Sequence, residues 1–434
     1  MTESWGRYPQ ARHAAEVRLA WRAGLSLPEV GPMLAHGQGR SYGDSCLNDG
    51  GKLLRTAGLD RFISFDRATG LLRCEAGVTL GEILRLVVPR GFFLPAVPGT
   101  KHVSVGGAIA NDIHGKNHHR AGTFGAHVRR LALLRSDGRL AELDPADPLF
   151  RATVGGLGLT GLITWAEIAL RPIPVAAVRA EAIPFAGIDE FLSLSDQGDA
   201  EFEYTVAWLD VDSRAQRGIF FRGNHAEGAI RAPALRATVP VDLPLVNGLT
   251  VRAFNAAYYA AQKLAGRSRL QHWDPFFFPL DGVDRWNRLY GRRGFLQFQC
   301  VVPTAEALRK LLEEAPASPL TVLKRFGSVP SPGILSFPRP GFTLALDVPN
   351  GGEETFARLA RLEAIAMEAG GALYPAKDAR MSPATFARSY PRLEEFRRFI
   401  DPAFSSSFWR RVAGSNSPFP PIPLPVPSPL LEYA

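Results

Sequence analysis

The chain has 434 residues, of which 46% are hydrophobic and 21% charged, a length and composition that allow two or three domains with substantial cores. Its three cysteines, Cys46, Cys74 and Cys300, are too few and too far apart for a disulfide framework or a zinc site, so a reducing compartment is expected. Lysine and arginine outnumber aspartate and glutamate by 50 to 42, which favours anionic partners, but the basic residues are dispersed and no recognised nucleic-acid motif is present. We therefore predict no nucleic-acid partner.

The first 20 residues carry arginines and acids and lack the apolar run of a signal peptide. No stretch of about 18 consecutive apolar residues, the minimum for a membrane-spanning helix, occurs anywhere in the chain. We expect a soluble, cytoplasmic protein. A peripheral position at the inner membrane, on either face and so also on the periplasmic one, is compatible with these features.

Residues 1–172 alternate short strand-like runs with glycine-rich loops. The runs "KLLRT", "RFISFD" and "LLRCEAG" predict strands, and "TLGEILRLVVPRG" predicts a helix that begins with a capping box of Thr79 and Glu82. The composition changes near residue 173, where "LRPIPVAAVRAEAIP" and "FEYTVAWLDV" predict strands of a larger sheet. An amphipathic helix over 355–370 ends at Gly370, and seven prolines in 418–429 predict an extended tail over 414–434.

Three glycine-dense stretches lie in the first domain: "HGQGRSYGD" (36–44), "VPGTKHVSVGGAIA" (97–110) and "GGLGLTG" (155–161). Glycine allows backbone N–H groups to approach a ligand closely, so such loops often cradle phosphates, although each alone is also an ordinary turn. A Rossmann motif is excluded because the third glycine position after Gly37 and Gly39 is Tyr42, and no P-loop lysine follows. The three loops together predict a large, elongated anion bound by another fold.

Five of the nine histidines fall between residues 102 and 127, and four basic side chains, His114, Lys116, His118 and His119, crowd into one short segment. The spacing of His114 and His118 suits a metal site on a helix, but a glycine interrupts that helix and only Asp112 could add a ligand. We therefore predict no metal. For His118 and His119, solvated loop positions are the simple alternative to a functional role.

The combination of "GQGRSYGD", "PGT", "GGAIANDIHGKNHH", "GTFG" and "GGLGLTG" resembles the vanillyl-alcohol-oxidase type of FAD-binding flavoprotein. Three further blocks, "DIHGKNHHRAGTFGAHV", "WNRLYGRRGFLQFQ" and "LYPAKDARMSPATFARSYPRLEEF", look like the decaprenylphosphoryl-β-D-ribose 2-oxidase family, and the resemblance runs from about residue 30 to about 412. It implies an α+β fold with an FAD-binding domain (1–172) and a substrate domain built on an antiparallel sheet (173–373). A C-terminal segment (374–413) would return to the FAD domain.

The resemblance implies one set of residues around FAD: Gly37, Gly39, Arg40, Ser41, Tyr42, Gly43, Gly99, Thr100, Ser104, Gly106, Gly107, Asn111, Ile113, His114, Ile163 and Tyr374. The segment "GGAIA" can open a helix whose free N–H groups and dipole face the diphosphate. Covalent flavoproteins of this type carry a histidine in the first loop, where this chain has Arg40. We therefore predict non-covalent FAD.

A flavin accepts the hydride of an alcohol, and a protein group must take up the hydroxyl proton. The candidates for this role are Tyr42, His114, Lys116 and Lys377, and the resemblance places Lys377 at a lysine considered essential for oxidation. It also places six residues on the substrate side: Lys116, Tyr290, Gln297, Gln299, Lys324 and Lys377. Thr343 and Ala345 replace the Asn-x-Cys pair of the mycobacterial type, which changes the shape of the pocket.

The family implies oxidation of the 2-hydroxyl of a polyprenyl-phosphoryl ribose to a 2-keto sugar, the first half of an epimerisation that yields an arabinose donor for cell-envelope polysaccharide. A short-chain reductase would be the partner. The alternative is a soluble aldonolactone or alditol oxidase of the same superfamily. Residues 239–293 contain apolar segments that alternate with basic residues. This pattern is typical of a membrane-docking surface, but a domain core with a solvated basic rim would show it equally well.

Overall fold

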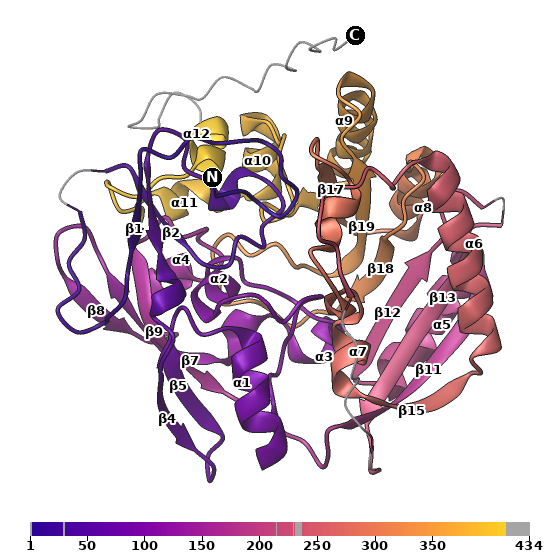
Figure 1. The fold of residues 1–434 in the computed structure, drawn as a ribbon, viewed down its shortest axis with the longest axis horizontal. Helices are drawn as coiled ribbons and strands as arrows, with labels where there is room; N and C mark the ends of the chain where they lie inside the picture. The colour runs from indigo at the N-terminus through magenta and orange to yellow at the C-terminus, as the bar shows by residue number, and fades with distance from the viewer. Residues whose placement is uncertain (1, 29–30, 214, 229, 231–236, 414–434) are drawn as a thin grey trace.

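The computed structural model describes residues 2–413 except 29–30, 214, 229 and 231–236, and the predicted proline-rich tail (414–434) lies outside the described residues. Two lobes stand side by side in Figure 1, one drawn in indigo and purple and the other around a broad sheet in pink and orange. The first lobe holds most of the glycine-rich loops, and the second holds the large sheet. The site described below lies where the two lobes meet.

The first lobe contains two sheets. A parallel sheet of order β1-β3-β2 is formed by β1 (Ala15–Arg18), β2 (Met33–His36) and β3 (Lys52–Arg55). An antiparallel sheet of order β4-β5-β9-β7-β8 is formed by β4 (Phe62–Asp66), β5 (Leu71–Glu75), β7 (Val128–Leu134), β8 (Leu140–Leu143) and β9 (Leu162–Ala169). The strands predicted in "KLLRT", "RFISFD" and "LLRCEAG" are confirmed as β3, β4 and β5.

Short helices pack in this lobe: α1 (Leu80–Val87), α2 (Val105–Ala110) and α4 (Pro148–Thr153). The short helix α3 (His118–Ala121) instead lies against the sheet of the second lobe. The predicted capping box of α1 is confirmed, because the Thr79 hydroxyl accepts from the Glu82 N–H and the Glu82 carboxylate accepts from the Thr79 N–H at 2.8 Å. Four apolar residues of α1 recur at helical spacing and are buried: Leu80, Ile83, Leu84 and Val87.

The second lobe is built on one eight-stranded sheet of order β15-β11-β13-β12-β18-β19-β17-β20, in which neighbouring strands are antiparallel. Its strands are β11 (Ala177–Ala186), β12 (Tyr204–Leu209), β13 (Arg217–His225), β15 (Ser268–His272), β17 (Phe295–Val302), β18 (Thr321–Phe326), β19 (Gly341–Pro349) and β20 (Ala372–Leu373). Two short pairs complete the β-structure: β6 (Phe92–Phe93) with β10 (Arg171–Pro172), and β14 (Ala237–Thr238) with β16 (Val283–Asp284).

The two faces of the large sheet have different neighbours. One face packs in a hydrophobic core against α5 (Ile188–Glu201), α8 (Ala305–Glu314) and α9 (Glu353–Glu368), and it contributes Leu296, Phe298, Leu344 and Leu346. The helix predicted over 355–370 is confirmed as α9, with Gly370 just beyond its end at φ +71°. The other face turns toward the first lobe and α6 (Gly248–Leu264), and α7 (Trp273–Phe277) joins the core of the first lobe.

The end of the described chain lies against the beginning. Helices α10 (Pro383–Ser389), α11 (Leu393–Arg397) and α12 (Ser407–Val412) stand beside the indigo strands in Figure 1. On α12, the buried Arg411 binds both carboxylate oxygens of Asp44, at 2.7 and 3.0 Å, and Asp378 at 2.9 Å. These contacts support the domain boundaries expected from the sequence, which stay a prediction.

Candidate active site

A cavity of about 870 Å³ lies between the two lobes, and both contribute to its walls. All but one of the residues implied for FAD line it: Gly37, Gly39, Arg40, Ser41, Tyr42, Gly99, Thr100, Ser104, Gly106, Gly107, Asn111, Ile113, His114, Ile163 and Tyr374. Gly43 does not line the cavity. A Cβ at that position would meet the Asp378 carbonyl oxygen at 1.8 Å, so this glycine allows two loops to pack closely instead of contacting a ligand.

The first glycine loop has the backbone geometry of an anion cradle. The N–H groups of Gln38, Gly39, Arg40 and Ser41 donate to no acceptor among the described residues, and Gly39 adopts φ +62°. Successive free N–H groups around a left-handed residue form a concave site for an anion. The loop therefore fits the diphosphate of FAD.

The expectation for "GGAIA" is wrong in one respect. This segment does open a helix, α2, but its first N–H groups are already used: Val105 donates to the Val78 carbonyl, Gly106 to the Ala76 carbonyl, both at 2.8 Å, and Gly107 to the Ser104 hydroxyl. No free N–H remains at these three positions to bind a diphosphate. The contribution of α2 to the cavity is its small residues, which keep that wall open.

On the second lobe, alternation along the strands selects the cavity side chains. Side chains two residues apart share a face, so Gln297 and Gln299 on β17 face the cavity while Leu296 and Phe298 enter the core. The same rule brings in Thr343, Ala345 and Asp347 on β19, Val322 and Lys324 on β18, Val206 and Trp208 on β12, and Phe221 on β13. The cavity floor is thus polar at β17 and β19 and apolar at β12 and β13.

A cluster of polar groups surrounds Lys377. Its Nζ lies 3.7 Å from the centroid of the Tyr42 ring, and the Tyr42 N–H donates to the Ala376 carbonyl at 2.8 Å. Gln297 donates from its side-chain amide to one oxygen of Asp347, whose other oxygen is buried without a hydrogen-bond partner in the described residues. Burial lowers the pKa of Lys377 to about 7, against the opposing effect of Asp347, and burial raises the pKa of Asp347 to about 7.

Asp347 is the residue that sequence reasoning missed. It stands two and four residues after Ala345 and Thr343, and so on the same face of β19 as these two positions. A carboxylate within the otherwise apolar run "LALDVP" is the signal that could have revealed it, because a buried acid needs a partner. Its register partner on β17 is Gln297.

His114 sits at the centre of an aromatic and amide network. Its Nε2 is 3.2 Å from the Gln299 side-chain amide, which also donates to the Thr343 hydroxyl at 3.2 Å. Tyr374 packs beside the His114 ring and donates its hydroxyl to the Asn111 carbonyl at 2.8 Å. Burial and the nearby lysines hold the pKa of His114 well below its usual range, so the ring is neutral.

The other basic residues of the histidine segment are buried or half-buried. Lys116 lines the cavity and donates to the Phe276 carbonyl, whereas His118 is 2% exposed and packs on the Phe326 ring with centroids 4.5 Å apart. His119 bonds through Nε2 to the Phe202 carbonyl at 3.0 Å. The simple alternative of solvated loop positions is therefore wrong for His118 and His119. Among the described residues, no group of three or more His, Cys, Asp or Glu side chains could hold a metal ion.

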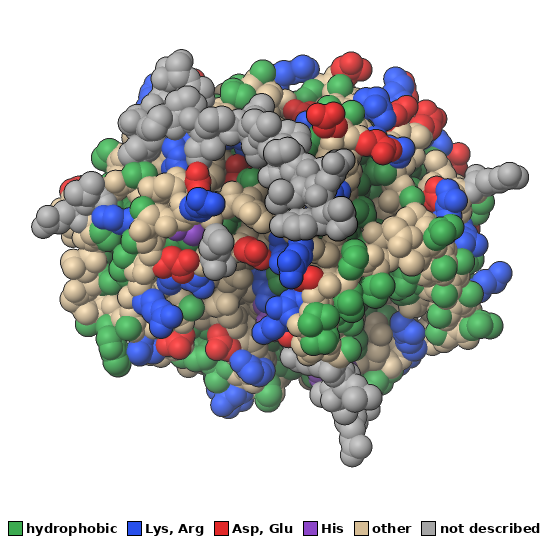
Figure 2. Space-filling view, turned by 45° about the horizontal axis from the view of Figure 1, so that its top comes forward, with side chains coloured by type: hydrophobic (Ala, Val, Ile, Leu, Met, Phe, Trp, Pro, Cys, Tyr) green, Lys and Arg blue, Asp and Glu red, His purple; other side chains and the backbone are tan. Residues whose placement is uncertain are grey.

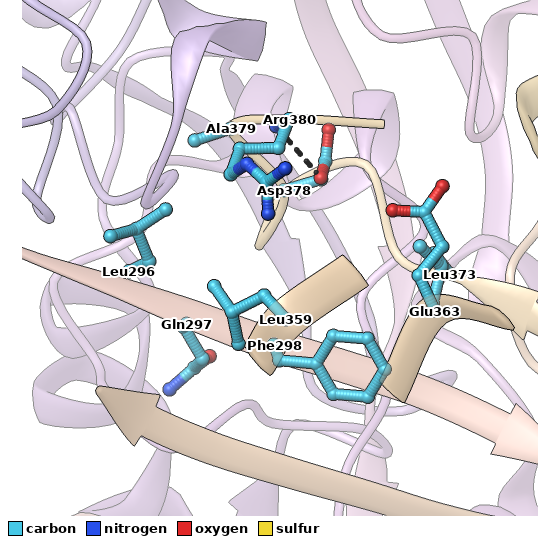
Figure 3. Close-up of a pocket in the computed structure, with 9 residues that line it drawn as sticks. All are labelled: Leu296, Gln297, Phe298, Leu359, Glu363, Leu373, Asp378, Ala379 and Arg380. Atoms are coloured by element: carbon cyan, nitrogen blue, oxygen red, sulfur yellow. Dashed lines mark hydrogen bonds between the residues drawn. The ribbon is translucent and has the colours of Figure 1, made fainter. Parts of the chain in front are cut away.

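A second cavity, of about 20 Å³, lies on the core side of β17 and is lined by Leu296, Gln297, Phe298, Leu359, Glu363, Leu373, Asp378, Ala379 and Arg380. Figure 3 shows the loop 378–380 passing over β17 and α9, with the Arg380 N–H bonded to the Asp378 carboxylate at 3.0 Å. This volume holds about one water molecule. The small cavity therefore belongs to the packing that supports the Lys377 loop.

Comparison with known proteins adds the family. A model described as "FAD binding domain" matches residues 9–144. Over 415 residues, 88% of this chain and 89% of the relative, the sequence is 38% identical to the decaprenylphosphoryl-beta-D-ribose oxidase of Mycolicibacterium smegmatis. The chain belongs to the decaprenylphosphoryl-β-D-ribose oxidase family. The predicted family, its vanillyl-alcohol-oxidase-type α+β fold, the FAD cofactor and the class of FAD-dependent oxidoreductase are confirmed.

Other relatives match either most of the chain or only about a third of it. An "uncharacterized protein in mprA 5'region" of Streptomyces coelicolor is 32% identical over 77% of this chain and 100% of its own length. The alditol oxidase of Streptomyces sp. (strain IKD472 / FERM P-14339) is 30% identical over 32% of this chain and 34% of its own length. Similarity to the oxidase family therefore extends through both lobes, whereas similarity to the alditol oxidase covers about a third of the chain.

FAD is expected to dissociate from this protein. The Arg40 guanidinium lies over the Trp5 ring, 4.1 Å from its centroid. The nearby His36 does not line the cavity, and its ring bonds to the Cys46 carbonyl at 2.8 Å. Burial raises the pKa of the Cys46 thiol to about 12, so this thiol is a poor nucleophile for attachment to the flavin. Acid precipitation should leave a colourless pellet and a yellow supernatant that contains FAD of unchanged mass. A pellet that stays yellow, or a peptide carrying the mass of FAD, would contradict the expectation.

Proposed function

We propose that this chain oxidises the 2-hydroxyl of a polyprenyl-phosphoryl ribose to a 2-keto sugar with FAD. The observation that carries the proposal is the cavity itself, which joins the FAD loops, the Lys377 cluster and an apolar floor in one space. A free sugar would leave the apolar part of the cavity unused, whereas a lipid-linked sugar has an apolar chain to fill it. The name of the 38% identical relative supports the same substrate class.

The chemistry divides between the cofactor and the chain. FAD, when bound, supplies the acceptor for the hydride that leaves the carbinol carbon. The hydroxyl proton must pass to a protein group, and Lys377 is suited to accept it because its lowered pKa of about 7 leaves much of the amine neutral near neutral pH. The nearby Asp347 carboxyl group favours the charged form of Lys377 and so stabilises the ammonium that forms. The side chains of His114 and Tyr42 are uncharged and form the neighbouring walls of the cavity.

A 2-keto sugar must be reduced from the opposite face to complete an epimerisation. We therefore assign the second half-reaction to a separate short-chain reductase, and the product to an arabinose donor for cell-envelope polysaccharide. The competing assignment, a soluble aldonolactone or alditol oxidase, leaves the apolar floor at β12 and β13 without a function.

Anaerobic bleaching of the flavin band tests the proposal. We expect farnesyl- or decaprenyl-phosphoryl ribose to bleach the oxidised band of the purified protein, and free pentitols and aldonolactones to leave it unchanged. The corresponding arabinose derivative, with the opposite configuration at C2, serves as a matched control. Bleaching by free polyols alone would transfer the assignment to the alditol or aldonolactone oxidase.

The proton acceptor can be tested through pH. Because the neutral amine is the base, and because its pKa is lowered to about 7, the rate of flavin reduction should rise with pH through about 7 and then level off. Lys377→Met should lower this rate by about 10² to 10⁴ fold while the flavin spectrum is retained, and Lys377→Arg should not restore it. Lys310→Met at the surface is the control. A rate that falls with pH, or an active Lys377→Met enzyme, would exclude Lys377 as the base.

A membrane surface is the second part of the proposal. Leu249 and Leu264 on α6 are 79% and 87% exposed, and exposed apolar residues continue along the preceding segment at Val241, Leu243 and Leu245. Figure 2 shows apolar side chains among basic ones on its right-hand side, which is the side on which α6 lies in Figure 1. The sequence piece "WDPFFFPL", expected to share this surface, is instead buried in the core of the first lobe. Within the described residues, no helix has the length and apolarity to cross a bilayer.

The inner side of α6 supports docking, because Val251, Phe254 and Tyr258 line the apolar part of the cavity. We expect the protein to sediment with phosphatidylglycerol vesicles at low salt, less at high salt, and less with phosphatidylcholine. Replacing both Leu249 and Leu264 by Ser, neither of which lines the cavity, should weaken binding by about tenfold or more. Leu140→Ser on β8, 51% exposed, is the matched control. Failure of the unaltered protein to sediment at low salt would overturn docking.

A further inference from the structure

A buried acid lies directly behind the FAD side of the cavity. Asp112 is 0% exposed and does not line the cavity, whereas the next two residues, Ile113 and His114, do. Among the residues that the structure describes, no Lys, Arg or His nitrogen lies within 4.0 Å of its carboxylate. The backbone of Asp112 has φ +40°, a left-handed conformation that a residue other than glycine keeps only where its surroundings hold it. The contacts of this side chain therefore need an explanation.

Three donors from the two lobes surround the Asp112 carboxylate. One of its oxygens accepts from the Gly125 N–H at 2.9 Å, within the first lobe. The other oxygen accepts from the hydroxyls of Ser331 and Ser336, the second of these at 2.5 Å. Both serines lie on the segment 327–340, which connects β18 to β19 in the second lobe. The carboxylate therefore joins the two lobes through hydrogen bonds that are closed off from water.

The same segment of the second lobe brings an aromatic ring to His114. Phe337 follows Ser336, is 1% exposed, and stacks on Tyr374 with ring centroids 4.7 Å apart. The rings of Phe337 and Tyr374 both lie beside the His114 ring, with centroids 5.7 and 5.3 Å away. Asp112 thus reaches His114 by two routes. One runs along two peptide bonds of the chain, and the other runs through Ser336 and Phe337.

The other end of the histidine segment is also tied to the second lobe. The Thr205 N–H on β12 donates to the Lys116 carbonyl at 2.9 Å, and Arg120 donates to two carbonyls in the last turn of α5 at 2.6 and 3.1 Å. A cationic side chain is favourable at that end of a helix, because the last carbonyl groups and the helix dipole are negative there. His114 is therefore held between two ties across the lobes, and the Asp112 tie lies next to the rings that contact it.

We propose that Asp112 is a positioning residue, whose carboxylate fixes the His114 ring on the FAD side of the cavity by joining the two lobes behind it. This role concerns the cofactor and goes beyond the proposed function, because it does not depend on which alcohol is oxidised. Without the carboxylate, the hydroxyls of Ser331 and Ser336 would be left in a buried place without their acceptor, and the lobes would lose this tie. We therefore expect the flavin to be held less firmly when the carboxylate is removed.

Two measurements on the FAD-loaded protein test this role without turnover. The visible circular dichroism of bound FAD reports the surroundings of the flavin ring, and the rise of flavin fluorescence after dilution reports the release of FAD. We expect Asp112→Ala to change the dichroism of the oxidised flavin band and to release FAD about tenfold faster or more, as for the loss of hydrogen bonds to a charged group. Asp112→Asn should stay within about threefold of the unaltered protein, because its amide oxygen still accepts from Gly125 and its NH₂ group can donate to the two hydroxyls.

Asp401→Ala is the matched control for the loss of a buried acid. Asp401 is 1% exposed and accepts from the Ser136 N–H and hydroxyl and from the Ala403 N–H, but it does not line the cavity. We expect this variant to lower the temperature of thermal unfolding and to leave the dichroism and the release of FAD unchanged. Asp112→Ala would give the same pattern if Asp112 only stabilised the fold, and that result would contradict the proposal.

The double variant Ser331→Ala with Ser336→Ala tests the tie itself, also in the event that Asp112→Ala does not fold. It should shift the dichroism and the release of FAD in the same direction as Asp112→Ala. Adding it to Asp112→Ala should have little further effect, because residues that share one set of hydrogen bonds do not act additively. Unchanged measurements in the serine variant, or full additivity with Asp112→Ala, would overturn the role of Asp112. Failure of lipid-linked ribose to bleach the flavin would instead reject the proposed function and leave this result standing.

Discussion

The placement of three half-buried lysines on the walls of one cavity is the constraint on which the site depends. Taking an ammonium out of water costs several kcal/mol unless an opposite charge or a set of hydrogen bonds replaces the lost hydration. Within the described residues no ion pair joins Lys116, Lys324 or Lys377 to a carboxylate, and Asp347 opposes only part of the effect of burial on the pKa of Lys377. Such a cavity is stabilised more by an anionic ligand than by a neutral ligand or by no ligand, because an anion offsets the charge of the amines.

This arrangement is possible because one sheet serves two purposes. Strands β17, β18 and β19 alternate between a hydrophobic core and the cavity, so the residues that stabilise the lobe and those that bind the ligand are neighbours along the chain. Leu296, Phe298, Leu344 and Leu346 pack with α8 and α9 and hold the strands rigid. The polar side chains between them are thereby presented from a fixed backbone, which is what orientation of a reacting hydroxyl requires.

The Lys377 loop is fixed from a different direction. Arg411 joins Asp378, the neighbour of Lys377, to Asp44, which closely follows Tyr42 in the first glycine loop. The absence of a side chain at Gly43 lets these two loops touch. A change at α12 would thus reach the contact between the Lys377 amine and the Tyr42 ring, and breaking a buried pair of this kind typically costs about 3 to 5 kcal/mol. The C-terminal segment is therefore part of the site although none of α10, α11 and α12 lines the cavity.

The sequence by itself determined the features that depend on local spacing. The glycine loops, the capping box of Thr79 and Glu82, the helix α9 and the motif containing Lys377 could all be recognised because each lies within a short stretch. Only the tertiary structure decided that Asp347 faces Lys377, that Lys116 and Lys324 share one space, that the N–H groups at the start of α2 are occupied, and that His118 is buried. The physical reason is that strand order and register bring distant residues together. Both follow from the packing of the whole chain, so a short motif does not determine them.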